Sequence, residues 1–309
     1  MWRIAVWGAA CGLFIGCAEV GSSGGGGGGG TDTGGGAVDT AGGGTDATGG
    51  AGSDVTGDGA GGVDGAAGTD GASAGVEKTI EALQQEMESV ECTEKSPGFT
   101  NGTKGVLAKG VVLVSSVIFK VDKPGKLDAA YVQDKGGGLW KGIYITGPNG
   151  GDLGKLKPGD VLDVQGDLVD YYCATQISGK KITKVEGATE LPVAVTLTLD
   201  KIGVNVTPKD NEATEGTLVS IENVVVSDNE PKGTDGKPHG EFYVGKDDKD
   251  KAVLVAPGFG TTFSVKGADG VFRASFPVGT KFKSIRGVVA YSFGAYKLVP
   301  LGDGALHAE

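Results

Sequence analysis

Few residues in this chain are of the types that catalyse reactions. The 309-residue sequence contains two histidines, His239 and His307, and neither has a partner at the spacing of a metal site. Asp167 and Asp170 form a close carboxylate pair, but solvated residues of a charge-mixed surface explain such a pair better than glycoside hydrolysis does. No Gly-x-Ser-x-Gly, phosphate-loop or His-Glu-x-x-His sequence is present. We therefore predict a non-enzymatic protein without a metal ion or cofactor.

Aromatic residues close to lysines offer a different chemistry, because rings beside cations can stack on bases or sugars. Trp140 is the strongest candidate, since it follows three glycines in what should be an exposed loop. The alternative is that rings in strands serve the core or cross-strand pairs. The candidate ligand-binding residues are Tyr131, Trp140, Lys141, Tyr144, Tyr171 and Tyr172.

Cys17 is the candidate for covalent modification. Arg3, an apolar run of about twelve residues and the small Gly16 precede it, as in a secretory signal. The run is too short to span a bilayer, which needs about 20 apolar residues. The sequence Phe-Ile-Gly-Cys resembles the lipobox of bacterial lipoproteins, which implies a signal peptide over 1–16 and a lipid on Cys17. By the same resemblance, Ala18 implies an outer-membrane lipoprotein on the cell surface or the periplasmic face. The alternatives are an ordinary cleaved signal and an uncleaved anchor.

Residues 17–76 are predicted to form a disordered tether. From Gly21 to Val76 the chain has 25 glycines, seven aspartates and no lysine, arginine or aromatic residue. So little apolar surface cannot offset an ordering cost of about 1–2 kcal/mol per residue. The aspartates are spaced irregularly and lack the calcium-binding nonapeptide, so solvation explains them better than calcium does. The tether would hold the rest of the chain away from a membrane.

The charge balance differs between the tether and the remainder. Of 39 acidic and 28 basic residues, eight acids and one base precede residue 77, which leaves 31 acids and 27 bases beyond it. A phosphate-driven nucleic-acid binder is expected to be basic instead. We therefore expect no strong nonspecific nucleic-acid binding.

The remaining sequence predicts an all-β fold with one short leading helix. Apolar residues recur at helical spacing between Val76 and Cys92, and β-branched segments separated by Gly- and Pro-containing turns follow. The pattern then repeats: Gly159 and Tyr171 lie 12 residues apart, as do Gly279 and Tyr291. We predict two domains, 77–195 and 196–309.

The order of segments resembles the OB-fold modules of bacterial extracellular proteins. It is carried by Tyr-Val-Gln-Asp, Gly-Ile-Tyr-Ile and Leu-x-Pro-Gly-Asp-Val-Leu-Asp-Val-x-Gly-x-Leu-x-x-Tyr in the first unit, and more weakly by Phe-Tyr-Val and Gly-Val-Val-Ala-Tyr in the second. The resemblance implies two tandem OB-like five-stranded β-barrels that bind a protein, glycan or oligonucleotide. Because such modules accompany secreted nucleases, an accessory nucleic-acid-binding component is the alternative, and a structural envelope protein is another.

Cys92 and Cys173 are the only cysteines after the tether. In an exported protein two remaining thiols suggest one disulfide. A bond between them would tie the predicted helix to the end of the strand that contains Tyr171. The alternative, a two-cysteine metal site, lacks a nearby histidine.

Overall fold

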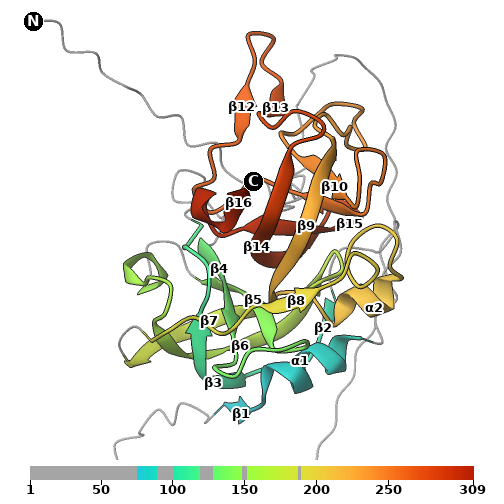
Figure 1. Ribbon diagram of the computed structural model, residues 1–309. Helices are drawn as coiled ribbons and strands as arrows, with labels where there is room; N and C mark the ends of the chain where they lie inside the picture. The colour runs from blue at the N-terminus through green and yellow to red at the C-terminus, as the bar shows by residue number, and fades with distance from the viewer. Residues whose placement is uncertain (1–74, 89–99, 119–127, 148–151, 187–188) are drawn as a thin grey trace, which may run out of the picture. The chain divides into compact units, whose positions relative to one another are not determined.

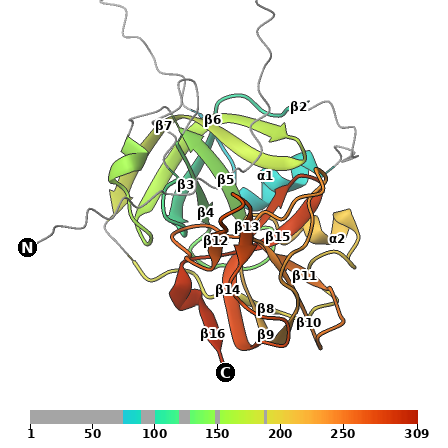
Figure 2. The same cartoon turned by 90° about the horizontal axis from the view of Figure 1, so that it is seen from above.

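The computed structural model describes residues 75–88, 100–118, 128–147, 152–186 and 189–309. These ranges hold two seven-stranded sheets and one two-stranded sheet. Each large sheet closes into a five-stranded barrel, and the two barrels lie side by side in both views (Figures 1 and 2). The predicted tether, signal peptide, Cys17 and Cys92 fall outside the described residues. In the part of the chain described, no helix is long and apolar enough to cross a membrane.

Barrel 1 consists of five strands of the first sheet. Their order is β3–β4–β5–β7–β6, and β6 pairs with β3 to close the barrel. All neighbouring strands are antiparallel except β5 and β7, which are parallel. The strands are β3 (Val106–Leu113), β4 (Asp128–Gln133), β5 (Gly142–Gly147), β6 (Val161–Tyr171) and β7 (Ala174–Glu186). Short β1 (Val76–Glu77) and β2 (Thr100–Asn101) pair with β3 and β6, and the 3-10 helix η1 (Asp152–Lys155) precedes β6.

Barrel 2 repeats this topology. Its order is β9–β10–β11–β15–β14, closed by β14 on β9, with β11 and β15 parallel. The strands are β9 (Leu218–Asp228), β10 (Phe242–Gly245), β11 (Val253–Val255), β14 (Lys281–Ser292) and β15 (Ala295–Pro300). The smaller elements are β8 (Val195–Leu197), α2 (Pro208–Glu212), η2 (Asp303–Ala305), β16 (Leu306–Ala308), and the two strands of a projecting arm, β12 (Ser264–Lys266) and β13 (Phe272–Ala274) (Figure 1).

This strand order is that of an OB-fold, a five-stranded Greek-key barrel. The prediction of an all-β chain with two tandem OB-like barrels and a short leading helix is therefore confirmed. The helix α1 (Ile80–Met87) begins at Thr79, whose side chain accepts a hydrogen bond from the Ala82 amide at 3.2 Å. The short helix α2 was not predicted.

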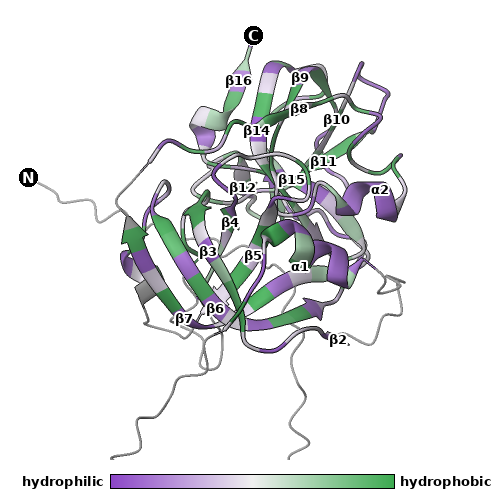
Figure 3. Ribbon diagram, turned by 90° about the horizontal axis from the view of Figure 1, so that it is seen from below, coloured by the Kyte–Doolittle hydropathy of each residue, from purple (hydrophilic) through white to green (hydrophobic). Residues whose placement is uncertain are grey.

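The sequence repeat that predicted two barrels corresponds to matching hairpins. Two-residue turns join β6 to β7 and β14 to β15, and both residues of each turn have positive φ. They are Tyr172 and Cys173 in barrel 1, and Phe293 and Gly294 in barrel 2. Such turns match the twist of the flanking strands. Figure 3 shows apolar and polar residues alternating along β6, as expected where one face of a strand points inward.

The barrels have different cores. In barrel 1, α1 contributes Ile80, Leu83 and Met87 to a core that is otherwise formed by Val, Ile, Leu and Ala. In barrel 2, Phe242 and Phe282 are fully buried, and the Phe242 ring lies 5.1 Å from that of Phe263. Side chains of α1 therefore fill part of the barrel 1 core, whereas phenylalanine rings fill the core of barrel 2.

A third apolar cluster joins the two barrels. Barrel 2 contributes Leu218, Ala256, Val288, Ala290 and Val299, and they pack against Val114, Ala129, Tyr131 and Tyr144 of barrel 1. The Gln133 Oε1 atom accepts a hydrogen bond from the Leu218 amide at 3.1 Å. We call this contact the seam.

Candidate ligand-binding face

The outer side of strands two and three is where OB-folds commonly bind ligands. In barrel 1 these strands are β4 and β5, and Tyr131 pairs with Tyr144 across them, with ring centroids 4.9 Å apart. Both tyrosines lie in the seam and are only 3% and 6% exposed. Barrel 2 therefore covers the face on which the sequence placed these two candidates, and a ligand does not reach them in this structure.

Trp140 and Lys141 lie at the edge of the seam. Trp140 is half-buried rather than fully exposed as predicted, and its backbone amide donates to the Ala213 carbonyl at 2.7 Å. The Lys141 ammonium pairs with the Glu81 carboxylate, and this hydrogen bond raises the pKa of Lys141. Lys141 is thus paired with a residue of α1, and Trp140 is hydrogen-bonded to the segment that leads into barrel 2.

Tyr171 and Tyr172 lie at the β6–β7 turn, with ring centroids 4.8 Å apart. Tyr172 is 44% exposed and is the most accessible aromatic ring among the predicted residues. Cys173 follows in the turn; it is buried and disulfide-bonded. Since Cys92 lies outside the described residues, its pairing with Cys173 stays a prediction.

The corresponding face of barrel 2 carries residues that we did not predict. Tyr243 of β10 pairs with Leu254 of β11, and Leu254 pairs with Lys297 of β15. Paired residues on adjacent strands point to the same side, so these three form one row across the sheet. We call this row and the residues that contact it, Asp228, Glu241, Lys251 and Phe293, the barrel 2 face.

Two lysines and two rings are combined on the barrel 2 face. The Lys251 ammonium lies 5.8 Å from the centroid of the half-exposed Tyr243 ring. The Lys297 ammonium lies 5.5 Å from the centroid of Phe293, which is 62% exposed at the β14–β15 turn. Contacts of this kind place a cation beside a surface on which a planar group can stack.

Each lysine also has a carboxylate partner. Lys251 donates a hydrogen bond to Asp228 at 2.6 Å. Burial alone would raise the pKa of Asp228, but this hydrogen bond outweighs burial, so the pKa is lowered. Lys297 donates to Glu241 at 2.7 Å, and both side chains are about one-tenth exposed. Burial is also the main reason why the pKa of Tyr243 is raised, so this phenol stays protonated at neutral pH. The barrel 2 face is therefore nearly neutral.

A signal for Tyr243 was present in the sequence. The repeat aligns Phe-Tyr-Val at 242–244 with Ala-Tyr-Val at 130–132, which makes Tyr243 the counterpart of Tyr131. The turns likewise make Phe293 the counterpart of Tyr172. The candidates were sought only in the first unit because its match to the OB pattern was better.

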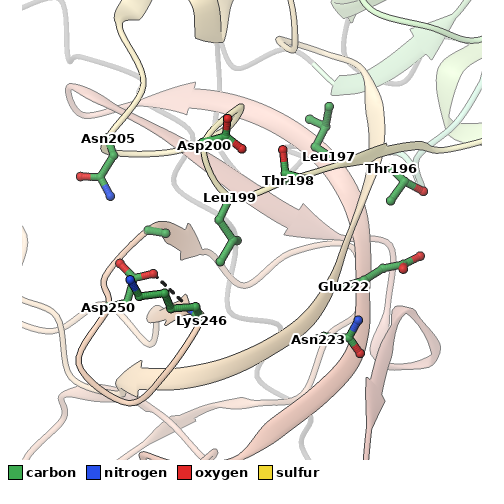
Figure 4. Close-up of a pocket in the computed structure, with 11 residues that line it drawn as sticks. Thr196, Leu197, Thr198, Leu199, Asp200, Asn205, Glu222, Asn223, Lys246 and Asp250 are labelled. Carbon is green, nitrogen blue, oxygen red and sulfur yellow. Dashed lines mark hydrogen bonds between the residues drawn. The ribbon is translucent and has the colours of Figure 1, made fainter.

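A hollow of about 570 Å³ lies elsewhere on barrel 2 (Figure 4). It offers hydrogen-bonding groups but no aromatic ring, and one of its loops is fixed by the Lys246 amide, which donates to Asp250 Oδ2 at 3.1 Å. We therefore place the candidate site on the barrel 2 face. The hollow is lined by Thr196, Leu197, Thr198, Leu199, Asp200, Asn205, Glu222, Asn223, Lys246, Asp250 and Ala252.

No family model matches this sequence, and no curated protein matches it either. A solved HINa domain in complex with a 20-bp double-stranded DNA is similar at 13% identity and a TM-score of 0.29, over 69% of this chain and 98% of that chain. A murine DNA-binding protein bound to double-stranded DNA is similar at 11% identity and a TM-score of 0.29, over 67% and 98%.

A single-stranded DNA-binding protein from Thermus aquaticus is also similar, at 12% identity and a TM-score of 0.21, over 68% of this chain and 95% of that chain. The expectation of no strong nonspecific nucleic-acid binding is contradicted by these matches, because the proteins concerned are DNA-binding proteins. The argument from net charge behind that expectation considered the whole chain and left out aromatic rings on which single bases can stack.

Proposed function

We propose that this protein is a non-enzymatic binding module and that its ligand is a single-stranded oligonucleotide, which stacks on the barrel 2 face. One observation carries the proposal: the OB ligand face is covered in barrel 1, whereas in barrel 2 it presents Tyr243 and Phe293, each beside a lysine. Every base has a flat face, so such rings bind single strands with little sequence preference.

The charge arrangement predicts how this binding responds to salt. Lys297 is held by Glu241 in a nearly buried pair, whereas Lys251 is about half exposed and its pair with Asp228 can exchange for a phosphate. We therefore expect about one phosphate contact, so that log K falls with log salt concentration with a slope near −0.7. Stacking would provide most of the affinity.

The test is a titration of the full chain with a fluorescein-labelled single-stranded oligothymidylate, followed by anisotropy. Tyr243→Ala and Phe293→Ala should each weaken binding by about 1–3 kcal/mol, the usual contribution of one stacked base. Tyr172→Ala is the matched control, since Tyr172 occupies the same turn of barrel 1 as Phe293 does in barrel 2.

Equal affinity of Tyr243→Ala and the wild type would refute the assignment to this face. Loss of binding in Tyr172→Ala alone would move the site to barrel 1. If the chain binds a neutral oligosaccharide and no oligonucleotide, the same rings serve a glycan and the nucleic-acid proposal is wrong.

We further propose that Cys17 is lipidated and that this module is held at the outer membrane by residues 17–76. The short apolar run before Cys17 supports the proposal, and so does the Gly- and Asp-rich composition after it. Cys17→Ser should move the protein from the carbonate-washed membrane fraction to the soluble fraction. Equal membrane retention of both forms would exclude a lipid on Cys17.

A further inference from the structure

Three buried carboxyl groups meet where the two barrels join. Asp170 comes from β6 of barrel 1, while Glu212 and Glu215 come from the end of α2 and the turn that leads into β9. They are 3%, 9% and 2% exposed, respectively. A tyrosine of barrel 2, Tyr296 in β15, donates its hydroxyl hydrogen to Glu212 Oε2 at 2.5 Å.

The same carboxyl groups bind backbone atoms of barrel 1. Glu215 Oε1 accepts from the Thr175 amide at 2.9 Å, and Asp170 Oδ1 accepts from the Cys173 amide at 2.9 Å. Within the described ranges the other oxygen of Glu215, Oε2, is buried and has no hydrogen-bond partner. A buried carboxylate in this position would be costly, because it has neither water nor a donor to stabilise its charge.

The ionisable groups that shift the pKa of Glu212 and Glu215 are acids and phenols. Burial is the largest cause of the raised pKa of Glu212, which reaches about 7, and the charges of Asp170 and Glu88 add to it. Burial, followed by the charges of Glu212 and Asp170, raises the pKa of Glu215 well above its usual range. The phenols that interact with these two glutamates are Tyr131 and Tyr296. Glu88 is itself paired with Lys209 of α2, at 3.5 Å.

A bound cation is not a sufficient explanation for this cluster. Among the described residues, no group of three or more His, Cys, Asp or Glu side chains is placed to hold a metal ion. Protonation allows adjacent buried carboxyl groups to avoid mutual repulsion.

The cluster lies beside the contact that covers the barrel 1 face. The segment that contains Glu212 and Glu215 also accepts the Trp140 amide at Ala213. Gly142 and Gly216 approach so closely that a methyl group on Gly142 would lie 2.1 Å from the Gly216 carbonyl oxygen. Ionising the cluster would therefore act directly on the seam that buries Tyr131 and Tyr144.

We propose that Asp170, Glu212 and Glu215 form a proton-dependent latch. When these carboxyl groups are protonated, barrel 2 is held over strands β4 and β5 of barrel 1. When they are ionised, barrel 2 moves away from these strands and exposes Tyr131 and Tyr144 as a second ligand face. This inference does not depend on the ligand proposed for the barrel 2 face. The charges that open the latch are those of the cluster itself.

The direction of the pH effect follows from the raised carboxyl pKa. The closed state binds protons more tightly than the open state, so closing is favoured most below the ordinary pKa of 4.5 and the advantage is lost as the pH rises through about 7. For Glu212 alone the change from 4.5 to about 7 corresponds to a factor of roughly 300 in the equilibrium between the closed and open states.

Trp140 provides the readout, because the only other tryptophans are Trp2 and Trp7. In the full chain with Trp2→Phe and Trp7→Phe, we expect acrylamide quenching of Trp140 to increase between about pH 5 and about pH 9, with a midpoint near 7. In Glu212→Gln/Glu215→Gln, which cannot ionise at these positions, quenching should stay at its low-pH value. Glu190→Gln, an exposed carboxyl in the linker, is the control and should behave as the wild type.

Tyr296→Phe tests the latch independently, should the double variant fail to fold. The Tyr296 hydroxyl stabilises the ionised form of Glu212, so its removal should shift the midpoint to higher pH. Quenching that does not change with pH in the wild type would overturn the proposal. So would a double variant with the wild-type midpoint, or a Tyr296→Phe midpoint that is unchanged or lower.

Discussion

The two barrels carry corresponding rows of residues that differ in exposure at one position, because Tyr243 is half-exposed whereas Tyr131 is buried. In barrel 1 the row is Tyr131, Tyr144 and Gln176, and barrel 2 covers its two tyrosines. In barrel 2 the corresponding row is Tyr243, Leu254 and Lys297, with a half-exposed ring at one end and Phe293 against the lysine at the other. Equal topology thus does not imply equal accessibility, since barrel 2 covers the side of barrel 1 that carries Tyr131 and Tyr144.

The cores of the two barrels differ in a related way. Barrel 1 is filled by apolar side chains of α1, which lies outside the five-strand repeat. Barrel 2 is filled by Phe282 of β14 and by Phe263 and Phe276 of the connection between β11 and β14, which surround Phe242. We therefore expect the stability of barrel 2 to depend on single aromatic residues.

Phe242→Ala should produce the largest loss of stability. The Phe242 ring is fully buried and contacts three other phenylalanine rings, so its removal leaves a cavity that strands cannot close. We expect the free energy of unfolding to fall by about 3–5 kcal/mol in urea titrations. Phe293→Ala, at an exposed turn, should cost much less; similar losses for both variants would contradict the assigned core.

Lys297→Met should have the next largest effect. It removes one partner of a nearly buried ion pair and leaves the Glu241 carboxylate without its lysine. Because an unpaired buried charge is costly, we expect a loss of about 3 kcal/mol at neutral pH, measured by urea unfolding. Lys251→Met breaks an exposed pair on the same face and should cost about 1 kcal/mol or less. If the two variants are equally stable, Lys297 is not buried as described.

Gly142→Ala should open the seam. The added methyl group would overlap with the backbone of Gly216, which cannot move without shifting the start of barrel 2. Overpacking of this kind costs about 1–3 kcal/mol, and quenching of Trp140 should increase at every pH. Gly136→Ala is the control, because its methyl group would enter open space. Unchanged quenching in Gly142→Ala would show that the seam tolerates displacement.

The sequence predicted the barrels because their signals are local. Turn glycines such as Gly159 and Gly279, and the spacing of each to its tyrosine, recur in both units, and both glycines have the positive φ that such turns require. The leading helix was predicted between Val76 and Cys92, and α1 (Ile80–Met87) lies within that range. Strand order needed the OB resemblance, since parallel pairing of β5 with β7 leaves no local signal.

The packing of barrel 2 on barrel 1 at the seam was not predicted, although the sequences of β4 and β5 are consistent with strands that are buried on both sides. All six residues of β4 are buried, and so are all six of β5, because one side faces the core and the other faces barrel 2. Strands buried on both sides have apolar runs without regular alternation. Ala-Ala-Tyr-Val and Gly-Ile-Tyr-Ile are such runs, and we interpreted their tyrosines as a ligand surface.

Thr79→Ala is the smallest of the expected changes and tests whether α1 belongs to barrel 1 energetically. The Thr79 hydroxyl accepts the Ala82 amide at 3.2 Å, and loss of such a helix cap costs about 1 kcal/mol. Because Gln84 of this helix donates to the Gly142 carbonyl at 2.7 Å, fraying of α1 should reach the start of β5. Urea unfolding should show the loss, and hydrogen exchange should quicken in β5 and not in β11, its counterpart in barrel 2.

Thr207→Ala removes the equivalent cap of α2 and is the control, since it should leave exchange in β5 unchanged. Equal hydrogen-exchange rates in β5 of the wild type and of Thr79→Ala would mean that barrel 1 does not depend on α1 for its stability.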